Sequence, residues 1–160
     1  AAAPGLRIVV CDPDPGRRRF AAELGAAVTA TPSDLAPAVA AASAGLGAEA
    51  VFDTVGGAGP LAQGLEVVRP GGTVLLFAHA GEGEPAGFEL NPFFKNERRV
   101  VATYSGTVEE QRRVAAWLTN GVLDPSLLVS HRLSLGDTAH GFELMRRRQA
   151  LKVLVAPAGR

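Results

Sequence analysis

The stretch Arg7-Ile8-Val9-Val10-Cys11-Asp12-Pro13-Asp14-Pro15-Gly16-Arg17 decides the fold class of this 160-residue chain. Its apolar residues predict a strand over 6–11, buried on both faces as in a parallel sheet. Asp12 ends that strand, and Asp14 followed by Pro15 indicates the start of a helix. The stretch therefore predicts a strand that ends in a carboxylate and leads directly into a helix.

Strand-like and helix-like segments alternate along the following residues, which is typical of a parallel sheet with helical crossovers. We expect strands at 27–31, 50–55, 73–78 and 99–104, helices that open at Thr31, Pro60 and Thr107, and a turn at 69–72. After a strand-like run at 127–129, a helix through Phe142 and a strand at 151–155 complete the chain. The pattern predicts an α/β fold, with a partial Rossmann-type doubly wound parallel sheet in residues 1–106 and a small α+β segment in residues 107–160.

Composition narrows the class of function. The chain has 16 basic and 16 acidic residues, so no net charge indicates a nucleic acid or an anionic membrane as partner. Cys11 is its single cysteine, which excludes an internal disulfide and fits a cytoplasmic protein. No apolar run approaches the ~18–20 residues that span a bilayer.

Asp12 is the sharpest functional candidate. In a dinucleotide-binding βαβ unit, an acid roughly 20 residues after a glycine-rich loop accepts hydrogen bonds from the cofactor ribose. The residues before Asp12 leave no room for that first strand and loop. We therefore expect a sheet that lacks its central strand, with unpaired inner edges at 6–11 and 50–55. Such a sheet closes the gap, leaves a groove or recruits another chain.

Five motifs, in this order, make the sequence similar to the zinc-type medium-chain dehydrogenases, a family that includes alcohol, sorbitol and threonine dehydrogenases. The motifs are Val10-Cys11-Asp12-Pro13-Asp14, Glu23-Leu24-Gly25-Ala26, Val51-Phe52-Asp53-Thr54-Val55-Gly56-Gly57, Arg69-Pro70-Gly71-Gly72-Thr73-Val74 and Leu151-Lys152-Val153-Leu154-Val155. The resemblance covers the chain from about residue 5 to its end and implies the later part of such an enzyme.

The resemblance also implies a set of NAD-binding residues. Asp12 is similar to the acid that accepts both ribose hydroxyls and repels a 2′-phosphate, which favours NAD over NADP. The other implied contacts are Arg17 near the same ribose, Pro13 and Val55 beside the adenine with Thr54 and Gly56 next to them, Leu76, Ala78, Thr103 and Ser105 at the nicotinamide, and Lys152 at the pyrophosphate. Each also has a plain structural explanation, such as a helix cap, a turn or a surface cation.

The family's reaction is hydride transfer between a secondary alcohol or polyol carbon and the nicotinamide ring, with zinc polarising the oxygen. In the family the zinc ligands belong to an upstream domain. Cys11, His79, His131 and His140 show no metal-ligand spacing, so we assign no zinc site. We give His131 and His140 structural or exposed roles, whereas His79 is either a polar contact to cofactor or substrate or a loop residue without a role. We expect the chain to be inactive alone. The family dimerises near the region similar to 86–94, which makes Phe93 and Phe94 candidate contacts, with core packing as the alternative.

Two other interpretations stay open. An S-adenosylmethionine-dependent methyltransferase also ends a strand with a ribose-binding acid, although its sheet finishes in an antiparallel hairpin. Alternatively, the chain is a non-catalytic fragment or remnant that retains an oligomerisation surface.

Overall fold

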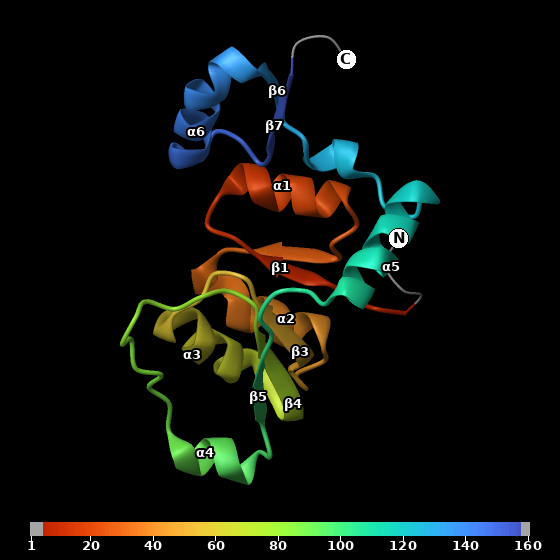
Figure 1. Cartoon of the computed structure of the whole chain (residues 1–160). Coiled ribbons are helices and arrows are strands. Elements are labelled where there is room, and N and C mark those ends of the chain that lie inside the picture. Colours follow the sequence, from red (N-terminus) through yellow and green to blue (C-terminus); the bar gives the residue numbers. More distant parts are fainter. Residues whose placement is uncertain (1–4, 158–160) are drawn as a thin grey trace. The chain divides into compact units, whose positions relative to one another are not determined.

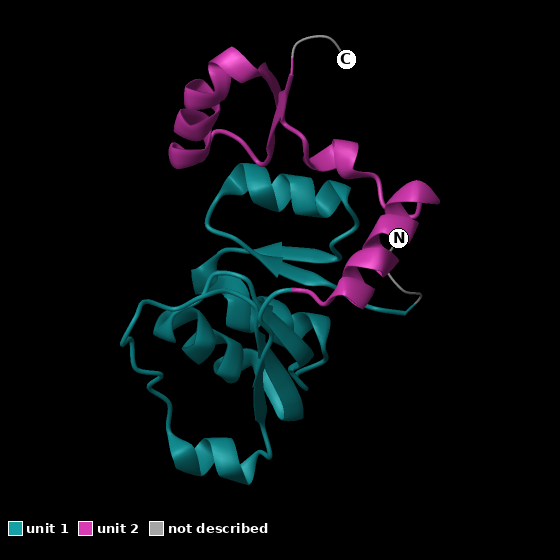
Figure 2. Cartoon of the chain, viewed as in Figure 1, with its two compact units in different colours: residues 1–105 teal, residues 106–160 magenta. Residues whose placement is uncertain are grey.

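The computed structural model describes residues 5–157, and the chain forms two compact units, residues 1–105 and residues 106–160 (Figure 2). Residues 1–4 of the predicted sheet segment and residues 158–160 of the predicted C-terminal segment lie outside the described residues.

The first unit alternates strands and helices as the sequence predicts (Figure 1). Its elements are β1 (Val9–Cys11), α1 (Pro15–Glu23), β2 (Val28–Ala30), a 3₁₀ turn (Pro32–Asp34), α2 (Leu35–Ala42), β3 (Ala48–Asp53), α3 (Ala58–Val67), β4 (Val68–Leu76), α4 (Leu90–Lys95) and β5 (Arg99–Ala102). β1 pairs in parallel with β2, and β3, β4 and β5 form a parallel sheet in that order. The α/β class with parallel strands is therefore confirmed.

Local signals explain the start of α1. The Asp14 side chain accepts a hydrogen bond from the Arg17 backbone N–H at 2.9 Å, and Pro15 occupies the first helical position. The side chain of Asp14 holds a lowered pKa, chiefly because of that hydrogen bond. The helix following the first strand is thus fixed by its own sequence.

The core of the first unit lies between α3 and one face of the β3-β4-β5 sheet. Leu61 and Leu65 of α3 are buried with Val68 and Val74 of β4, and Val74 is fully inaccessible to solvent. Gly64 faces the sheet, where an added Cβ would lie 3.2 Å from Val74 Cγ1. The absence of a side chain at Gly64 allows α3 to pack closely on the strands.

Several predicted boundaries are wrong. Residues 69–72, predicted as a turn, belong to β4, where the pairing register shifts because Ala48 pairs with Val68 and Ala50 with Thr73. The Gly71 N–H donates to Asn96 O at 2.8 Å, and Gly71 has a φ of +70°, so residues 69–72 form a bulge within β4 that is held by a distant segment. β1 begins only at Val9, three residues after the predicted start of the strand at residue 6.

The second unit contains α5 (Val108–Thr119), a 3₁₀ turn (Pro125–Leu128), β6 (His131–Ser134), a second 3₁₀ turn (Leu135–Asp137), α6 (Thr138–Arg146) and β7 (Val153–Ala156). The predicted helix start at Thr107 is confirmed by a capping box, in which Thr107 Oγ1 accepts from the Glu110 N–H and Glu110 Oε2 accepts from the Thr107 N–H. The strand predicted at 127–129 is wrong, because Asp124 caps a 3₁₀ turn there.

β6 and β7 pair in parallel, with α6 packed against both strands. Gly141 of α6 is buried, and an added Cβ would lie 3.1 Å from Val153 Cγ1. Among the described residues, no helix has the length and apolarity to cross a membrane.

Candidate functional site

Asp12 follows β1 at the carboxyl end of the strand. Its Oδ1 accepts a hydrogen bond from the Asp14 N–H at 2.8 Å, and its Oδ2 lies 3.9 Å from Arg17 Nη1. Arg18 donates to the Asp12 carbonyl at 2.6 Å, so the strand end is held from the helix. The side chain of Asp12 remains 25% exposed, which leaves a fixed carboxylate oxygen able to accept hydrogen bonds from hydroxyl groups.

Cys11 precedes this carboxylate. Burial raises the pKa of its thiol, the negative charge of Asp12 raises it further, and the Arg18 guanidinium opposes both effects. Cys11 is therefore a free thiol in its protonated form at neutral pH.

The turn after β3 is organised by Asp53, a residue that sequence reasoning did not single out. Asp53 is only 5% exposed, and its Oδ1 accepts hydrogen bonds from the N–H groups of Val55 and Gly56, each at 2.9 Å. Its Oδ2 is buried without a partner among the described residues. The sequence does contain a signal for this role of Asp53, because an acid that ends a strand two residues before Val55 has the pattern of an Asx turn.

Gly56 lies against the segment that follows β4. Its φ is +83°, and a Cβ built there would lie 2.0 Å from the His79 carbonyl oxygen. Only glycine allows this approach, which brings the turn after β3 beside residues 78 and 79.

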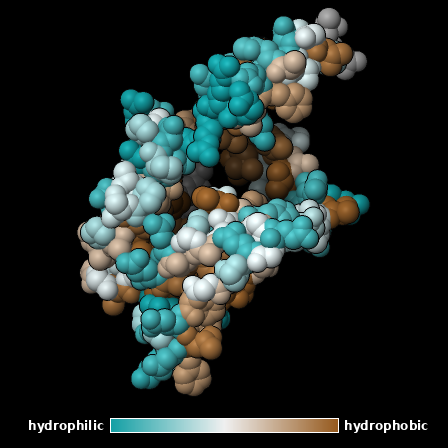
Figure 3. Space-filling view, turned by 90° about the vertical axis from the view of Figure 1, so that its left-hand side faces the viewer, coloured by the Kyte–Doolittle hydropathy of each residue, from teal (hydrophilic) through white to brown (hydrophobic). Residues whose placement is uncertain are grey.

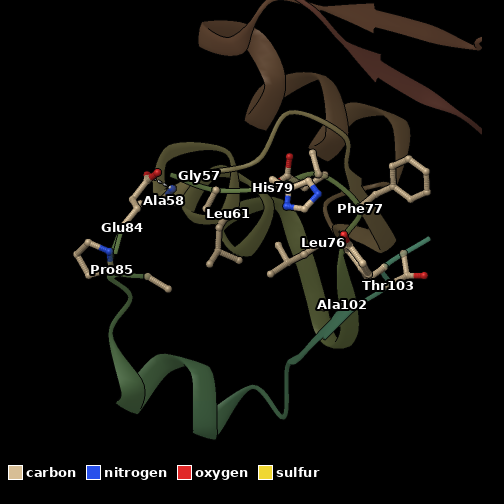
Figure 4. Close-up of a pocket in the computed structure, with 15 residues that line it drawn as sticks. Gly57, Ala58, Leu61, Leu76, Phe77, His79, Glu84, Pro85, Ala102 and Thr103 are labelled. Atoms are coloured by element: carbon tan, nitrogen blue, oxygen red, sulfur yellow. Dashed lines mark hydrogen bonds between the residues drawn. The ribbon is translucent and has the colours of Figure 1, made fainter. Parts of the chain in front are cut away.

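A hollow of about 260 Å³ opens next to this contact (Figure 4). It is lined by the start of α3, the end of β4 and the residues after β5, including Leu76, Ala78 and Thr103. His79, a candidate contact that is not among the predicted site residues, also lines it and meets Tyr104 edge-to-face, with ring centroids 5.4 Å apart. The hollow is therefore mostly apolar, with an aromatic pair at its border.

Glu84 fixes one wall of this hollow (Figure 4). Its carboxylate accepts hydrogen bonds from the Ala58 N–H at 2.7 Å and from the Gly81 N–H at 3.1 Å. These two bonds, the one from Ala58 first, lower the pKa of Glu84. The negative charge lies at the N-terminus of α3, where the helix dipole favours it. The sequence offers no signal that Glu84 pairs with Ala58, which lies 26 positions away.

The structure gathers most of the predicted site residues in the first unit. Asp12, Pro13 and Arg17 surround the end of β1, while Gly56 lies against Ala78 and His79. Thr54 and Val55 are exposed in the turn after β3, so Val55 is not part of a strand.

The two strands that carry the predicted nicotinamide contacts end two residues earlier than expected. Leu76 is the last residue of β4, and Ala78, Thr103 and Ser105 all follow strand ends. Ser105 has a φ of +59°. Lys152 belongs to the second unit, where it is exposed and its carbonyl accepts from the Ser130 N–H at 3.0 Å.

Phe93 and Phe94 have different surroundings. Phe93 packs on the core and stacks with Phe88 at a ring-centroid distance of 4.9 Å, whereas Phe94 is 81% exposed. Core packing thus accounts for the first ring, and the second is open to a contact.

The described residues do not fit a zinc ion. Within residues 5–157, no group of three or more His, Cys, Asp or Glu side chains is arranged to hold a metal. We therefore derive no chemical step through a metal in this chain.

The comparisons identify the family. The family model for zinc-binding dehydrogenases matches residues 1–120. L-Threonine 3-dehydrogenase of Bacillus velezensis (strain DSM 23117) is 28% identical over 158 residues, which are 98% of this chain and 46% of that enzyme. The chain thus spans about half the length of the curated relatives it matches.

Solved structures agree. Alcohol dehydrogenase TADH from Thermus sp. ATN1 is 31% identical with a TM-score of 0.85, over 94% of this chain and 44% of that one. A structure assigned as a zinc-binding dehydrogenase of Sinorhizobium meliloti 1021, bound to NADP, is 25% identical with a TM-score of 0.83, over 94% and 45%. The parallel pairing of β6 and β7 and the family match rule out the methyltransferase interpretation. The chain belongs to the zinc-binding dehydrogenase family.

Proposed function

We propose that this chain is the C-terminal, NAD-binding portion of a dehydrogenase that oxidises a secondary alcohol or polyol. The observation that carries the proposal is Asp12, a carboxylate held at the carboxyl end of a parallel strand by the Asp14 N–H. Ligands of open α/β sheets bind at such strand ends. Bound NAD would accept a hydride from the alcohol carbon, while this chain's residues bind and orient it.

Asp12 also supports NAD over NADP. One of its oxygens is free of short contacts, the nearest cation being Arg17 at 3.9 Å, so it can accept hydrogen bonds from ribose hydroxyls. The same negative charge would repel a 2′-phosphate. A relative from S. meliloti was solved with NADP bound.

The close approach of Gly56 to His79 supports a proposal for where the adenine and the nicotinamide of the cofactor bind. It brings the turn at 54–56 beside Ala78, and Leu76, Ala78 and Thr103 line one hollow. We propose that Pro13 and Val55 border the adenine, that the hollow side of β4 and β5, with Ser105, borders the nicotinamide, and that Lys152 contacts the pyrophosphate. We also propose that residues 107–160 return the chain toward a separate catalytic domain, and that Phe94 contributes to a homo-oligomer.

Titration of the chain with NAD and with NADP, followed by ligand-detected NMR, tests the proposal. The substitution Asp12→Asn should weaken NAD binding about tenfold or more, because it removes a charged acceptor, and should narrow the difference between the two cofactors. Glu23→Gln, an exposed change at the other end of α1, is the matched control. Equal binding of NAD by the wild type and Asp12→Asn would contradict the role of Asp12.

A further inference from the structure

The hollow of the first unit contains an unequal set of charged groups. Its lining includes the carboxylates of Asp53 and Glu84 and the imidazole of His79, and no lysine or arginine is among the described residues that line it. The other lining residues are glycine or apolar, or carry only the hydroxyl groups of Thr103 and Tyr104. While the imidazole is uncharged, the hollow therefore has a net negative charge that favours a bound cation.

Glu84 is held in place and is ionised at neutral pH. Hydrogen bonds from the N–H groups of Ala58 and Gly81, the one from Ala58 first, lower the pKa of Glu84 below its ordinary value of 4.5. A Cβ at Gly57 would lie 3.1 Å from Glu84 Oε1, so this glycine leaves room for the carboxylate at the start of α3. The N-terminus of α3 offsets roughly half a unit of charge, so Glu84 still contributes a negative field.

Asp53 adds a second carboxylate at the end of β3. The residue is 5% exposed, and its Oδ1 accepts from the N–H groups of Val55 and Gly56. Its Oδ2 has no partner among the described residues, and the ion pairs found there do not include Asp53. Buried charges are screened less by salt than exposed ones, so the field of Asp53 extends into the hollow.

His79 can change the charge of the hollow near neutral pH. Its backbone is fixed by the close approach of Gly56, and its ring meets Tyr104 at an interplanar angle of 88°. Figure 4 shows the imidazole among the side chains that line the hollow. The other titratable groups of the lining are Asp53, Glu84 and Tyr104, since α3 contributes only alanine and leucine. Histidine gains a proton between about pH 8 and pH 5, which would cancel about one of the two negative charges.

Water weakens these charges without removing their effect. The hollow is open on one side, because Tyr104 is 81% exposed and Phe77 is 64% exposed. Figure 3 likewise shows hydrophobic residues that reach the surface among hydrophilic ones. At an effective dielectric constant between those of a protein surface and water, a unit charge about 7 Å from a bound cation changes its affinity about threefold to tenfold.

The two redox forms of NAD differ in charge at the nicotinamide ring. The ring is positively charged in NAD+ and uncharged in NADH, while the adenosine and the phosphates are the same in both forms. The ratio of the two affinities therefore reports the electrostatic field at the ring, because the contacts of the shared part cancel. This argument rests on the proposed function, which puts the nicotinamide beside the hollow.

We propose that His79 determines whether this site prefers the oxidised or the reduced cofactor. With an uncharged imidazole, the carboxylates of Asp53 and Glu84 favour the positive ring of NAD+. With a protonated imidazole, the advantage of NAD+ is reduced and NADH binds relatively better. The hollow thus selects the redox form of its cofactor by charge, and acid shifts the selection toward NADH.

Titrations of the 160-residue chain with NAD+ and with NADH, at about pH 6 and about pH 8.5, test the proposal. Ligand-detected NMR of an adenine proton, which both forms share, gives the two dissociation constants under the same conditions. The ratio of NAD+ affinity to NADH affinity should fall about threefold from the higher pH to the lower pH. In His79→Gln, whose side chain is polar but does not titrate, the ratio should keep its high-pH value at both.

Two further variants separate the contributions. Glu84→Gln keeps an acceptor for one of the N–H groups of Ala58 and Gly81 but loses the charge, so it should lower the ratio about threefold at both pH values. His140→Gln changes an exposed histidine of α6 that does not line the hollow, and this matched control should behave as the wild type. Circular dichroism checks the fold of each variant.

The possible failures are distinguishable. A wild-type ratio that is the same at both pH values, or a ratio that changes equally in His79→Gln, would overturn the role of His79 while the cofactor still binds. Binding of neither redox form would contradict the proposed function and this proposal with it. The wild-type measurement needs no variant, so a variant that fails to fold leaves the test decisive.

Discussion

Gly56 shows how a single residue can hold two parts of the candidate site together. Its backbone combines a φ of +83° with an approach that would place a Cβ 2.0 Å from His79 O. Gly45 has the same φ of +83° but nothing within 4 Å of an added Cβ. A comparison of the two glycines therefore separates the cost of backbone strain from the cost of the steric clash.

Gly56→Ala should therefore lower the free energy of unfolding by more than about 3 kcal/mol, because backbone strain and a backbone clash act together. Gly45→Ala should cost only about 1 kcal/mol, the cost of the left-handed conformation alone. Urea denaturation of the two variants measures the difference. Equal losses would mean that the contact between Gly56 and His79 does not exist in solution.

Glu84 gives the loop at 80–86 a pH dependence. Hydrogen bonds from the Ala58 and Gly81 N–H groups lower the pKa of Glu84 below its ordinary value of 4.5. A group with a lowered pKa in the fold stabilises the fold above its ordinary pKa, and the contribution is lost as the pH falls through the lowered value. The loop should therefore be protected at neutral pH and loosen below about pH 4.5.

Exchange of the Ala58 and Gly81 amides, followed from pH 7 to pH 3 and corrected for intrinsic rates, measures this loosening. Glu84→Ala should expose both amides at neutral pH and abolish the acid step. Glu82→Ala, two residues away and exposed, is the matched control and should behave as the wild type. If exchange of the two amides still accelerates at acid pH in Glu84→Ala, another carboxylate causes the loosening.

At the scale of elements, α3 depends on a glycine for its close packing on the sheet. A Cβ at Gly64 would lie 3.2 Å from Val74 Cγ1 and 3.4 Å from Val51 Cγ1, and Val74 is fully buried and has no space to move. Gly59 lies in the same helix with nothing within 4 Å of an added Cβ.

The two glycines should respond differently to alanine. At Gly59 the better helix propensity of alanine, about 0.5–1 kcal/mol, is opposed because a Cβ on the residue before Pro60 disfavours the helical conformation, so Gly59→Ala should change the stability little. At Gly64 overpacking of about 1–3 kcal/mol should outweigh the gain in helix propensity, so Gly64→Ala should destabilise. Thermal unfolding of the two variants provides the comparison, and a stabilising Gly64→Ala would show that α3 packs less tightly than described.

Elements with local signals were predicted well from the sequence. The start of α1 follows from Asp14 and Pro15, and the start of α5 follows from the Thr107 and Glu110 capping box, since each signal lies within one helical turn. Residues 69–72 carry turn chemistry but form a bulge within β4, where Asn96 and Arg99 hydrogen-bond to the backbone of Gly71. Tertiary pairing of this kind is invisible to a local reading.

The candidate site divides in the same way. Asp12 could be proposed from the sequence because its place at a strand end is a local feature. Glu84 could not, because its partner at Ala58 lies 26 positions away, and only the folded chain brings the two together. Asp53 had a local signal in the turn that follows it.

At the scale of the whole molecule, the chain spans less than half of the curated threonine dehydrogenase that it matches. Residues 5–157 contain no set of ligands arranged for zinc, while the family description is that of a zinc-binding dehydrogenase. We therefore expect no measurable formation of reduced nicotinamide when the purified chain is mixed with NAD, zinc and a secondary alcohol. An absorbance assay checks this, with a full-length threonine dehydrogenase and threonine as the positive control. Sustained turnover by the 160-residue chain would contradict the expectation.

The single cysteine of the chain also has a practical consequence for labelling. Cys11 directly precedes Asp12 and is a free thiol, so a thiol-reactive fluorophore attaches to the chain at one position only. Because burial raises the pKa of this thiol, the labelling reaction needs an alkaline buffer. The attached dye would then lie beside the carboxylate of Asp12, and its emission would respond to a ligand bound there.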